Sequence, residues 1–193
     1  MLKDLRVGLA ITGSFCNFAK IAPQIELLKT HGIKEILPIA SFNTLQETNR
    51  FSTQESIRKI LTEETGKEII DTISKAEPVG PKDMVDIIVI APCTGNTLAK
   101  LASGIADTAV TMAAKSHLRN KRPVLIAVST NDGLGGAAKN IGQLMNYKNI
   151  FFVPFRQDDC VNKENSLIAD FNKIPEAARL AIKGKQMQPI IIN

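Results

Sequence analysis

The stretch Val85-Asp-Ile-Ile-Val-Ile-Ala-Pro92-Cys-Thr-Gly-Asn-Thr97 decides the fold of this chain. Its apolar half predicts a strand buried on both faces, because parallel strands covered by helices are apolar almost throughout. From Pro92 onward the residues become small and polar, and a helical pattern follows over residues 94–103. A buried strand that enters a helix through a polar turn is typical of ligand sites at the carboxyl edge of open parallel sheets. We therefore interpret residues 94–97 as the floor of a small-molecule pocket.

The same alternation of strand and helix runs along the rest of the chain. Further strands are expected at residues 5–12, 33–40, 69–73, 122–128 and 149–154. Helices are expected at residues 15–31, 53–65, 108–118, 137–147 and 166–183, and loops at 42–52 and 155–165. This alternation predicts a parallel sheet with a layer of helices on each face. We expect one domain over residues 1–193, an α/β Rossmann-like three-layer sandwich with a parallel six-stranded sheet in the order 3-2-1-4-5-6.

The composition restricts the kinds of partner. Aromatic residues make up 5% of the chain and Trp is absent, which argues against a nucleic-acid module that stacks bases. Three cysteines without a CxxC spacing, and two histidines without a ligand-spaced partner, predict neither a disulfide framework nor a metal site. No apolar run reaches the roughly 18 residues of a membrane span, and no signal-peptide pattern precedes the first strand. We expect a soluble, cytoplasmic protein.

The predicted strand order brings four turns to one cleft at the carboxyl edge of the sheet. Each turn carries small polar side chains and backbone N–H groups at the start of a helix, which suit a phosphate or another anion. The four turns are Thr12-Gly-Ser14, Ser41, residues 94–97 and Ser129-Thr-Asn131. The first turn lacks GxGxxG, and the chain has no P-loop, so FMN is favoured over NAD. The alternative that Ser14, Thr94 and Ser129 are only helix caps stays open.

Acid–base groups are sparse around these turns. Asp132 and Asp107 lie near the carboxyl edge, but Asp107 is most simply the cap of the following helix. Cys93 would need a neighbouring base to act as a nucleophile, and the sequence offers none. We expect Cys93 to line the pocket without reacting.

Residues 91–107 resemble the signature of the homo-oligomeric flavin-containing cysteine decarboxylase superfamily. That signature is a Pro-x-Ser/Thr-Ala-Asn-Thr turn, an Ala-Lys helix and Gly-x-Ala-Asp. Thr12-Gly-Ser14 resembles the first flavin turn of the superfamily, and residues 129–131 with Leu134 fall where its decarboxylases carry Pro-x-Met-Asn-x-x-Met. The resemblance implies a Rossmann-like flavoprotein fold, assembled as trimers or dodecamers with flavin between subunits. It implies that FMN is held by Gly13, Ser14, Ser41, Thr94, Asn96 and Thr97. Ser129 and Thr130 are further cofactor-binding candidates, from the fourth turn. Asn131 matches the Asn that contacts the substrate carboxylate, and is the candidate for catalysis and substrate binding.

Within that superfamily, the chain as a whole resembles the B-subunit family of dipicolinate synthases of spore-forming bacteria. Stretches that carry the likeness include Thr48-Asn-Arg-Phe51, Ala127-Val-Ser-Thr-Asn-Asp132 and Phe152-Val-Pro-Phe155. The resemblance implies a separate partner, the A subunit of dipicolinate synthase, through which NADP enters. It also implies a small dicarboxylate substrate, at the level of dihydrodipicolinate, converted to dipicolinate in the mother cell during sporulation. Arg50 is a candidate clamp for a substrate carboxylate, since Arg binds carboxylates bidentately; a surface Arg is the open alternative.

Four departures from the decarboxylase pattern bear on the chemistry. Residues 42–52 contain no His where the decarboxylases use one, Leu134 replaces a Met, Val128 replaces a Pro, and Gly95 replaces an Ala. These differences favour an oxidoreductase-type subunit, in which flavin takes a hydride from a dihydropyridine ring. Two alternatives stay open: a decarboxylase of a cysteine-type substrate, and a non-catalytic scaffold subunit.

Overall fold

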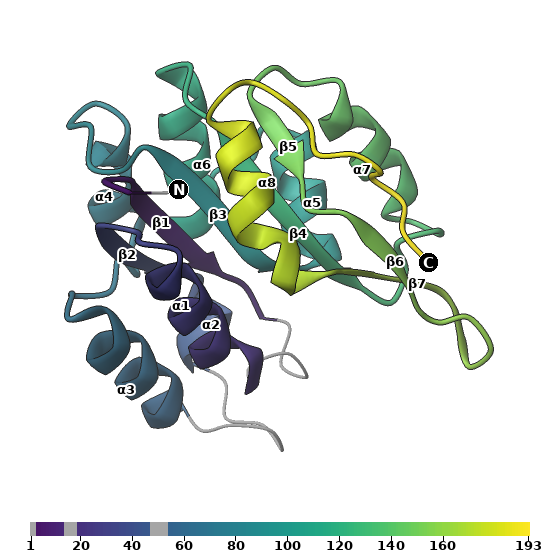
Figure 1. Cartoon of the computed structure of the whole chain (residues 1–193), viewed down its shortest axis with the longest axis horizontal. Helices are drawn as coiled ribbons and strands as arrows, with labels where there is room; N and C mark the ends of the chain where they lie inside the picture. Colours follow the sequence, from purple (N-terminus) through teal and green to yellow (C-terminus); the bar gives the residue numbers. More distant parts are fainter. Residues whose placement is uncertain (1–2, 14–18, 47–53) are drawn as a thin grey trace.

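The computed structural model describes residues 3–13, 19–46 and 54–193 as a mixed α/β sandwich of Rossmann-like type (Figure 1). Its central sheet follows the order β2-β1-β3-β4-β7-β6, and β5 also pairs with β4. The strands β1 to β5 are parallel where they pair, whereas β6 and β7 form an antiparallel hairpin. Their bounds are β1 (Arg6–Ile11), β2 (Glu35–Ala40), β3 (Ile87–Cys93), β4 (Val124–Thr130), β5 (Ile150–Phe152), β6 (Phe155–Asp159) and β7 (Lys163–Ala169).

Helices cover both faces of the sheet. In Figure 1, α1 and α8 lie on the near face, and α5 and α6 lie behind the sheet. The helices are α1 (Ile21–Thr30), α2 (Phe42–Gln46), α3 (Gln54–Thr65), α4 (Ile73–Ala76), α5 (Gly95–Ala102), α6 (Ala109–Arg119), α7 (Ala138–Met145) and α8 (Ile174–Ala181), with 3-10 turns η2 (Glu77–Val79) and η3 (Phe171–Lys173). Every residue of β3 is buried, as expected for a strand covered on both faces.

The six strands expected from the sequence stand in the expected order, but the third is reduced to one bridge. Ile70 pairs with Ile39 of β2 in a parallel bridge, on the side of β2 away from β1. The switch point of the sheet therefore lies between β1 and β3, as expected.

Two expectations for residues 155–183 were wrong. The loop over 155–165 and the first part of the helix expected from 166 are replaced by β6, β7 and η3, and α8 starts only at Ile174 with Pro175 in its first turn. Ser129 and Thr130 at the end of β4 pair with Ile168 and Leu167 of β7. This pairing with a distant strand overrides the local helical pattern, because strand formation depends on context.

Smaller differences concern the ends of helices and the loop after β2. Residues 42–46 form α2 where a loop was expected. The cap of α6 is Thr108 and not Asp107: Thr108 Oγ1 accepts from Thr111 N at 3.1 Å, and Thr111 Oγ1 accepts from Thr108 N at 3.1 Å. A capping box of this kind satisfies two backbone donors at once.

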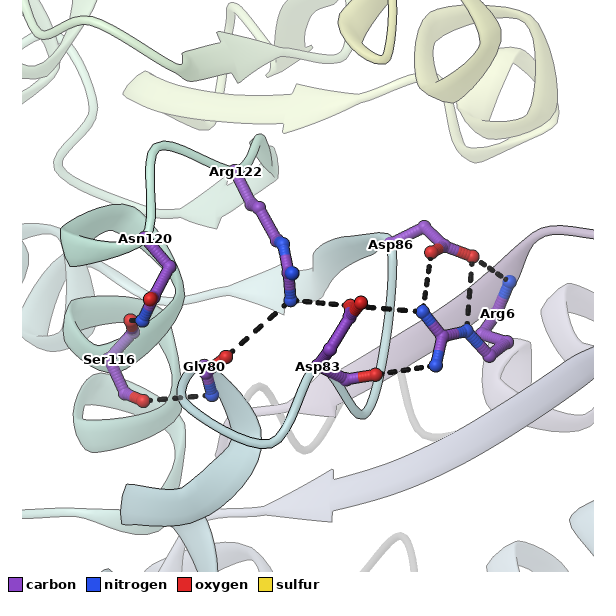
Figure 2. Close-up of polar contacts among 7 residues, drawn as sticks. All are labelled: Arg6, Gly80, Asp83, Asp86, Ser116, Asn120 and Arg122. Atoms are coloured by element: carbon purple, nitrogen blue, oxygen red, sulfur yellow. Dashed lines mark hydrogen bonds and ion pairs between the residues drawn. The ribbon is translucent and has the colours of Figure 1, made fainter.

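A network of ion pairs fixes the amino edge of the sheet, opposite the carboxyl edge (Figure 2). Arg6 contacts Asp86 at 2.7 Å and Asp83 at 3.0 Å, and Arg122 contacts Asp83 at 2.6 Å. These residues stand beside the first residues of β1, β3 and β4. Arg6 binds the carboxylate of Asp86 through Nη2 and Nε, which fixes the geometry of the pair as well as its charge.

Candidate functional site

A polar pocket of about 220 Å³ opens where β1, β2 and β3 end. Its walls come from three connections at the carboxyl edge of the sheet and from the first residue before α6. The lining residues are Thr12, Gly13, Ser41, Asn43, Thr94, Asn96, Thr97, Lys100 and Thr108. The pocket thus lies at the switch point, the position at which open α/β sheets bind ligands.

Thr12 joins two sides of the pocket. Its Oγ1 donates to the carbonyl of Pro92 at 2.8 Å and accepts from the backbone N–H of Thr94 at 3.1 Å. Thr12 is 1% exposed, and its bond to Pro92 is buried while its bond to Thr94 is partly buried. Thr12 therefore fixes the end of β1 against the turn that leads into α5.

The β2 side of the pocket is fixed by a second pair of hydroxyls. Ser41 Oγ lies 2.8 Å from Thr44 Oγ1, and Thr44 Oγ1 donates to the carbonyl of Ile11 at 3.3 Å. The backbone N–H of Ser41 also donates to the carbonyl of Ile11, at 3.1 Å. The turn after β2 is therefore held against β1 by its own side chains.

The first turn of α5 supplies the third wall. Thr94 is the N-cap, and its Oγ1 accepts from Thr97 N at 3.4 Å and lies 3.2 Å from Thr97 Oγ1. Asn96 is exposed and belongs to the pocket lining from the same turn. The amino end of a helix carries partial positive charge, which favours an anion at this position.

Lys100 brings an ammonium group to the pocket, with its charge offset by Asp107. Its Nζ lies 2.8 and 2.9 Å from the two carboxylate oxygens of Asp107. The hydrogen bond from Lys100 holds the pKa of Asp107 below its ordinary value, so the carboxylate stays ionised. Asp107, expected to be a helix cap, thus orients a lysine that faces the pocket.

The pocket brings together most of the predicted cofactor residues that the structure describes. Gly13, Ser41, Thr94, Asn96 and Thr97 all line it. Ser14 and Arg50 lie outside the described residues. Thr12, Asn43, Lys100 and Thr108 also line the pocket, although the sequence did not single them out as site residues. Two of these four carried a signal, since Thr12 belongs to the first predicted turn and Lys100 to the signature stretch.

The turn after β4 does not line this pocket, contrary to the expectation that four turns share one cleft. Ser129 and Thr130 belong to β4 and pair with β7, and Asn131 is exposed just beyond them. The β4 turn meets α5 on another side: a Cβ built on Gly95 would lie 2.8 Å from Thr130 Oγ1. That contact explains why Gly stands here where Ala is usual.

Cys93 belongs to the core, not to the pocket lining. The residue is fully buried among the apolar side chains of the sheet, and burial alone raises the pKa of its thiol. A neutral, enclosed thiol cannot act as a nucleophile. The expectation that Cys93 is unreactive agrees with this environment, whereas its predicted place in the pocket lining was wrong.

The pocket suits the phosphate and polyol part of a nucleotide. Hydroxyls, an amide, a lysine and a helix amino end converge on a space smaller than the roughly 300–1,000 Å³ that encloses a drug-sized ligand. Within residues 3–13, 19–46 and 54–193, no three His, Cys, Asp or Glu side chains gather as metal ligands. No helix among the same residues has both the length and the apolar character needed to cross a bilayer.

Comparison with known proteins agrees with this arrangement. Residues 1–179 match the family model described as Flavoprotein. The chain is 44% identical over 192 residues to the dipicolinate synthase B subunit of Bacillus subtilis (strain 168), covering 100% of this chain and 96% of the relative. The crystal structure of the dipicolinate synthase B subunit from Bacillus halodurans C superposes with a TM-score of 0.90 at 40% identity, covering 100% and 98% of the two chains.

A more distant solved structure shares the fold. The FMN-dependent cysteine decarboxylase SpaF superposes with a TM-score of 0.67 at 22% identity, over 95% of this chain and 99% of that one. The family match spans most of the chain and includes β1, β2, β3 and β4, whose carboxyl ends carry the polar turns. The chain therefore belongs to the flavoprotein family.

Proposed function

We propose that this chain is the flavin-binding B subunit of a dipicolinate synthase, and that the pocket at the carboxyl edge of the sheet holds FMN. The observation that carries the proposal is the convergence of Gly13, Ser41, Thr94, Asn96 and Thr97 on one polar pocket. These residues were singled out from the sequence because they match flavin turns. The whole-chain similarity to two B subunits supports the same assignment.

The size of the pocket supports an oligomeric active unit. A space of about 220 Å³ accommodates a phosphate and part of the ribityl chain, but not a complete flavin. The ring system would then lie outside this pocket, where a second copy of the chain could cover it. We propose a homo-oligomer, a trimer or a dodecamer, with flavin between subunits.

The residues of this chain would bind and orient the reactants. FMN, when bound, supplies the hydride acceptor that aromatisation of a dihydropyridine ring requires. Lys100 would balance the phosphate charge, and the first turn of α5 would donate backbone hydrogen bonds to it. Ser129 and Thr130 would contact the cofactor from the β4 side, and Asn131 and Arg50 would bind the carboxylates of the substrate.

The cellular assignment follows from the same relatives. We propose that the chain works with the A subunit of dipicolinate synthase, through which NADP enters, in the cytoplasm of the mother cell during sporulation. The substrate would be a small dicarboxylate at the level of dihydrodipicolinate. The redox role, and not decarboxylation, is favoured because residues 42–52 lack the His of the decarboxylases.

The test is a flavin titration of the purified protein, followed by absorbance and by quenching of flavin fluorescence. Asn96→Asp places a negative charge in the pocket and should weaken FMN binding about tenfold or more, since like charges repel at short range. Asn146→Asp makes the same change at an exposed position after α7, outside the pocket lining, and should bind FMN as the wild type does.

Two results would contradict the proposal. Equal FMN affinity in Asn96→Asp and the wild type would place the cofactor elsewhere. A protein that binds no FMN, with a partner A subunit that is fully active alone at matched concentration, would remove the catalytic role altogether.

A further inference from the structure

We infer that the chain has a second ligand site, which binds a small molecule with a flat apolar body and a carboxylate. The site is a cavity of about 430 Å³ between α1 and the base of the β6–β7 hairpin. It shares no lining residue with the polar pocket at the end of β1, β2 and β3. Figure 1 draws the elements that supply these residues, α1 and the chain that leads from β7 into α8.

A buried amide without a partner marks the cavity. Gln24 of α1 lines it and is 3% exposed, and neither Oε1 nor Nε2 forms a hydrogen bond with any residue of the described ranges. Leaving such a group unsatisfied costs about 1–3 kcal/mol, and buried amides in native proteins are almost always paired. Rotation of this amide toward a ligand in the cavity would give it hydrogen-bond partners and remove that cost.

The charges around the cavity favour an anion. Lys20 and Arg156 both line it and are exposed, and no Asp or Glu side chain of the described residues pairs with either. Arg156 has one long hydrogen bond, from Nη1 to Asn193 O at 3.4 Å, which leaves its other donors for a ligand. Both cations can therefore bind a carboxylate, and Arg can do so bidentately.

The two acidic residues that line the cavity are engaged by other groups. Asp158 pairs with Lys163 at 3.1 Å. Asp170 Oδ1 accepts from the backbone N–H of Asn172 at 3.1 Å, as the cap of η3. The lining itself carries two cations and two carboxylates, but Lys163, outside the lining, offsets Asp158, so one positive charge remains in excess around the cavity.

The remaining wall of the cavity is apolar and favours a ligand with a flat apolar ring. Phe171 is 9% exposed, and Lys20 Nζ stands 5.2 Å from the centre of its ring. Leu27 and Ile168 add aliphatic surface. A carboxylate beside Lys20 would leave the attached ring against Phe171, and the volume lies within the roughly 300–1,000 Å³ usual for small-molecule sites.

Benzene-1,3-dicarboxylate is a suitable probe, with benzene-1,3-dicarboxamide as its neutral counterpart. Calorimetric titration of the full-length protein, with and without saturating FMN, should show binding of the dicarboxylate in both cases and much weaker binding of the diamide. Lys20→Gln and Arg156→Gln should each weaken binding about tenfold, the usual effect of losing a hydrogen bond to a charged group. Lys29→Gln is the control, because Lys29 lies on the same helix and pairs with Glu64, away from the cavity.

Gln24→Leu separates a binding role from a packing role. If the amide serves a ligand, this variant should bind the probe about tenfold more weakly and keep or raise its melting temperature, since a buried unpaired amide is removed. A lower melting temperature with unchanged probe affinity would assign Gln24 to packing and overturn the inference. The inference also fails if the probe does not bind at about 10 mM, if FMN displaces it, or if Lys20→Gln and Arg156→Gln bind it like the wild type. Neither exposed substitution endangers folding, and a failure of FMN binding would leave this test unaffected.

Discussion

Acidification from pH 7 to pH 5 should destabilise the protein through one buried histidine. His117 on α6 is 0% exposed, and its two ring nitrogens form no hydrogen bond with any described residue. Burial, with a smaller contribution from the charge of Arg122, lowers its pKa from the ordinary 6.5 to about 4, while Asp86 and Asp83 oppose the shift. The imidazole is therefore neutral in the folded protein at pH 5, when most histidines in an unfolded chain are charged.

The sign and the size follow from this difference. Because the folded pKa is depressed, the unfolded chain binds more protons between about pH 4 and pH 6.5, so stability falls as the pH falls through that window. The shift costs about 2 kcal/mol between pH 7 and pH 5, and about 3 kcal/mol by pH 4. The pKa values of Asp71 and Asp86 are also lowered, but they titrate mainly below pH 5 and leave the upper part of the window to His117.

Urea unfolding at pH 7, 6 and 5, followed by circular dichroism, measures this effect. Wild type should lose about 2 kcal/mol of unfolding free energy between pH 7 and pH 5, and His117→Leu, which keeps a similar volume without a titrating group, should lose much less. His31→Leu is the matched control, because His31 is exposed, and should keep the wild-type pH dependence. Equal pH dependence in His117→Leu and the wild type would show that the buried imidazole is not the group responsible.

Three further changes test the site. Thr12→Val removes a hydroxyl that donates at 2.8 Å and accepts at 3.1 Å, so it should cost about 1–3 kcal/mol in urea unfolding and weaken FMN binding; unchanged stability would show that this junction matters little. Gly95→Ala places a Cβ 2.8 Å from Thr130 Oγ1 and 3.0 Å from Asp132 Oδ1, so it should lower the melting temperature at a cost of about 1–3 kcal/mol. Thr130→Ala should relieve part of this cost, and a loss that is undiminished in the double variant would point to another cause. Lys100→Gln should weaken FMN binding about tenfold while Lys100→Arg retains it, measured by fluorescence titration; equal affinities would place the phosphate away from this side chain.

Local pattern was enough to predict the parallel part of the sheet. The apolar runs that became β1, β3 and β4 each end at small turn residues. Their apolar composition is enough to predict that these strands are buried on both faces. The hairpin could not be predicted in this way. The strand β7 forms because Leu167 and Ile168 pair with the end of β4, which lies more than thirty residues earlier in the chain.

The same distinction applies to the site. Turn residues at the ends of consecutive buried strands converge because parallel strands end at one edge, so Ser41 and Thr94 were predictable from sequence. Lys100 lies in the signature stretch, but that signal did not show where its side chain points, because a lysine on an amphipathic helix usually faces solvent and Asp107 directs this one to the pocket. We expected the β4 turn to share the cleft with the other turns. The local pattern gives no sign that Ser129 pairs with β7, and this pairing is what sets the position of the turn.

The edge of the sheet next to β4 is covered by segments from different parts of the chain. The first half of β4 pairs with β5, and its last two residues pair with β7. The hairpin is completed in turn by the end of the chain: Phe155 N donates to Ile190 O at 3.0 Å, and Ile192 N donates to Phe155 O at 3.1 Å. Without residues 190–192, the edge of β6 at Phe155 would lack these partners and would be open to pairing with other chains. The segment at residues 190–192 therefore protects this edge of the hairpin against pairing with other chains.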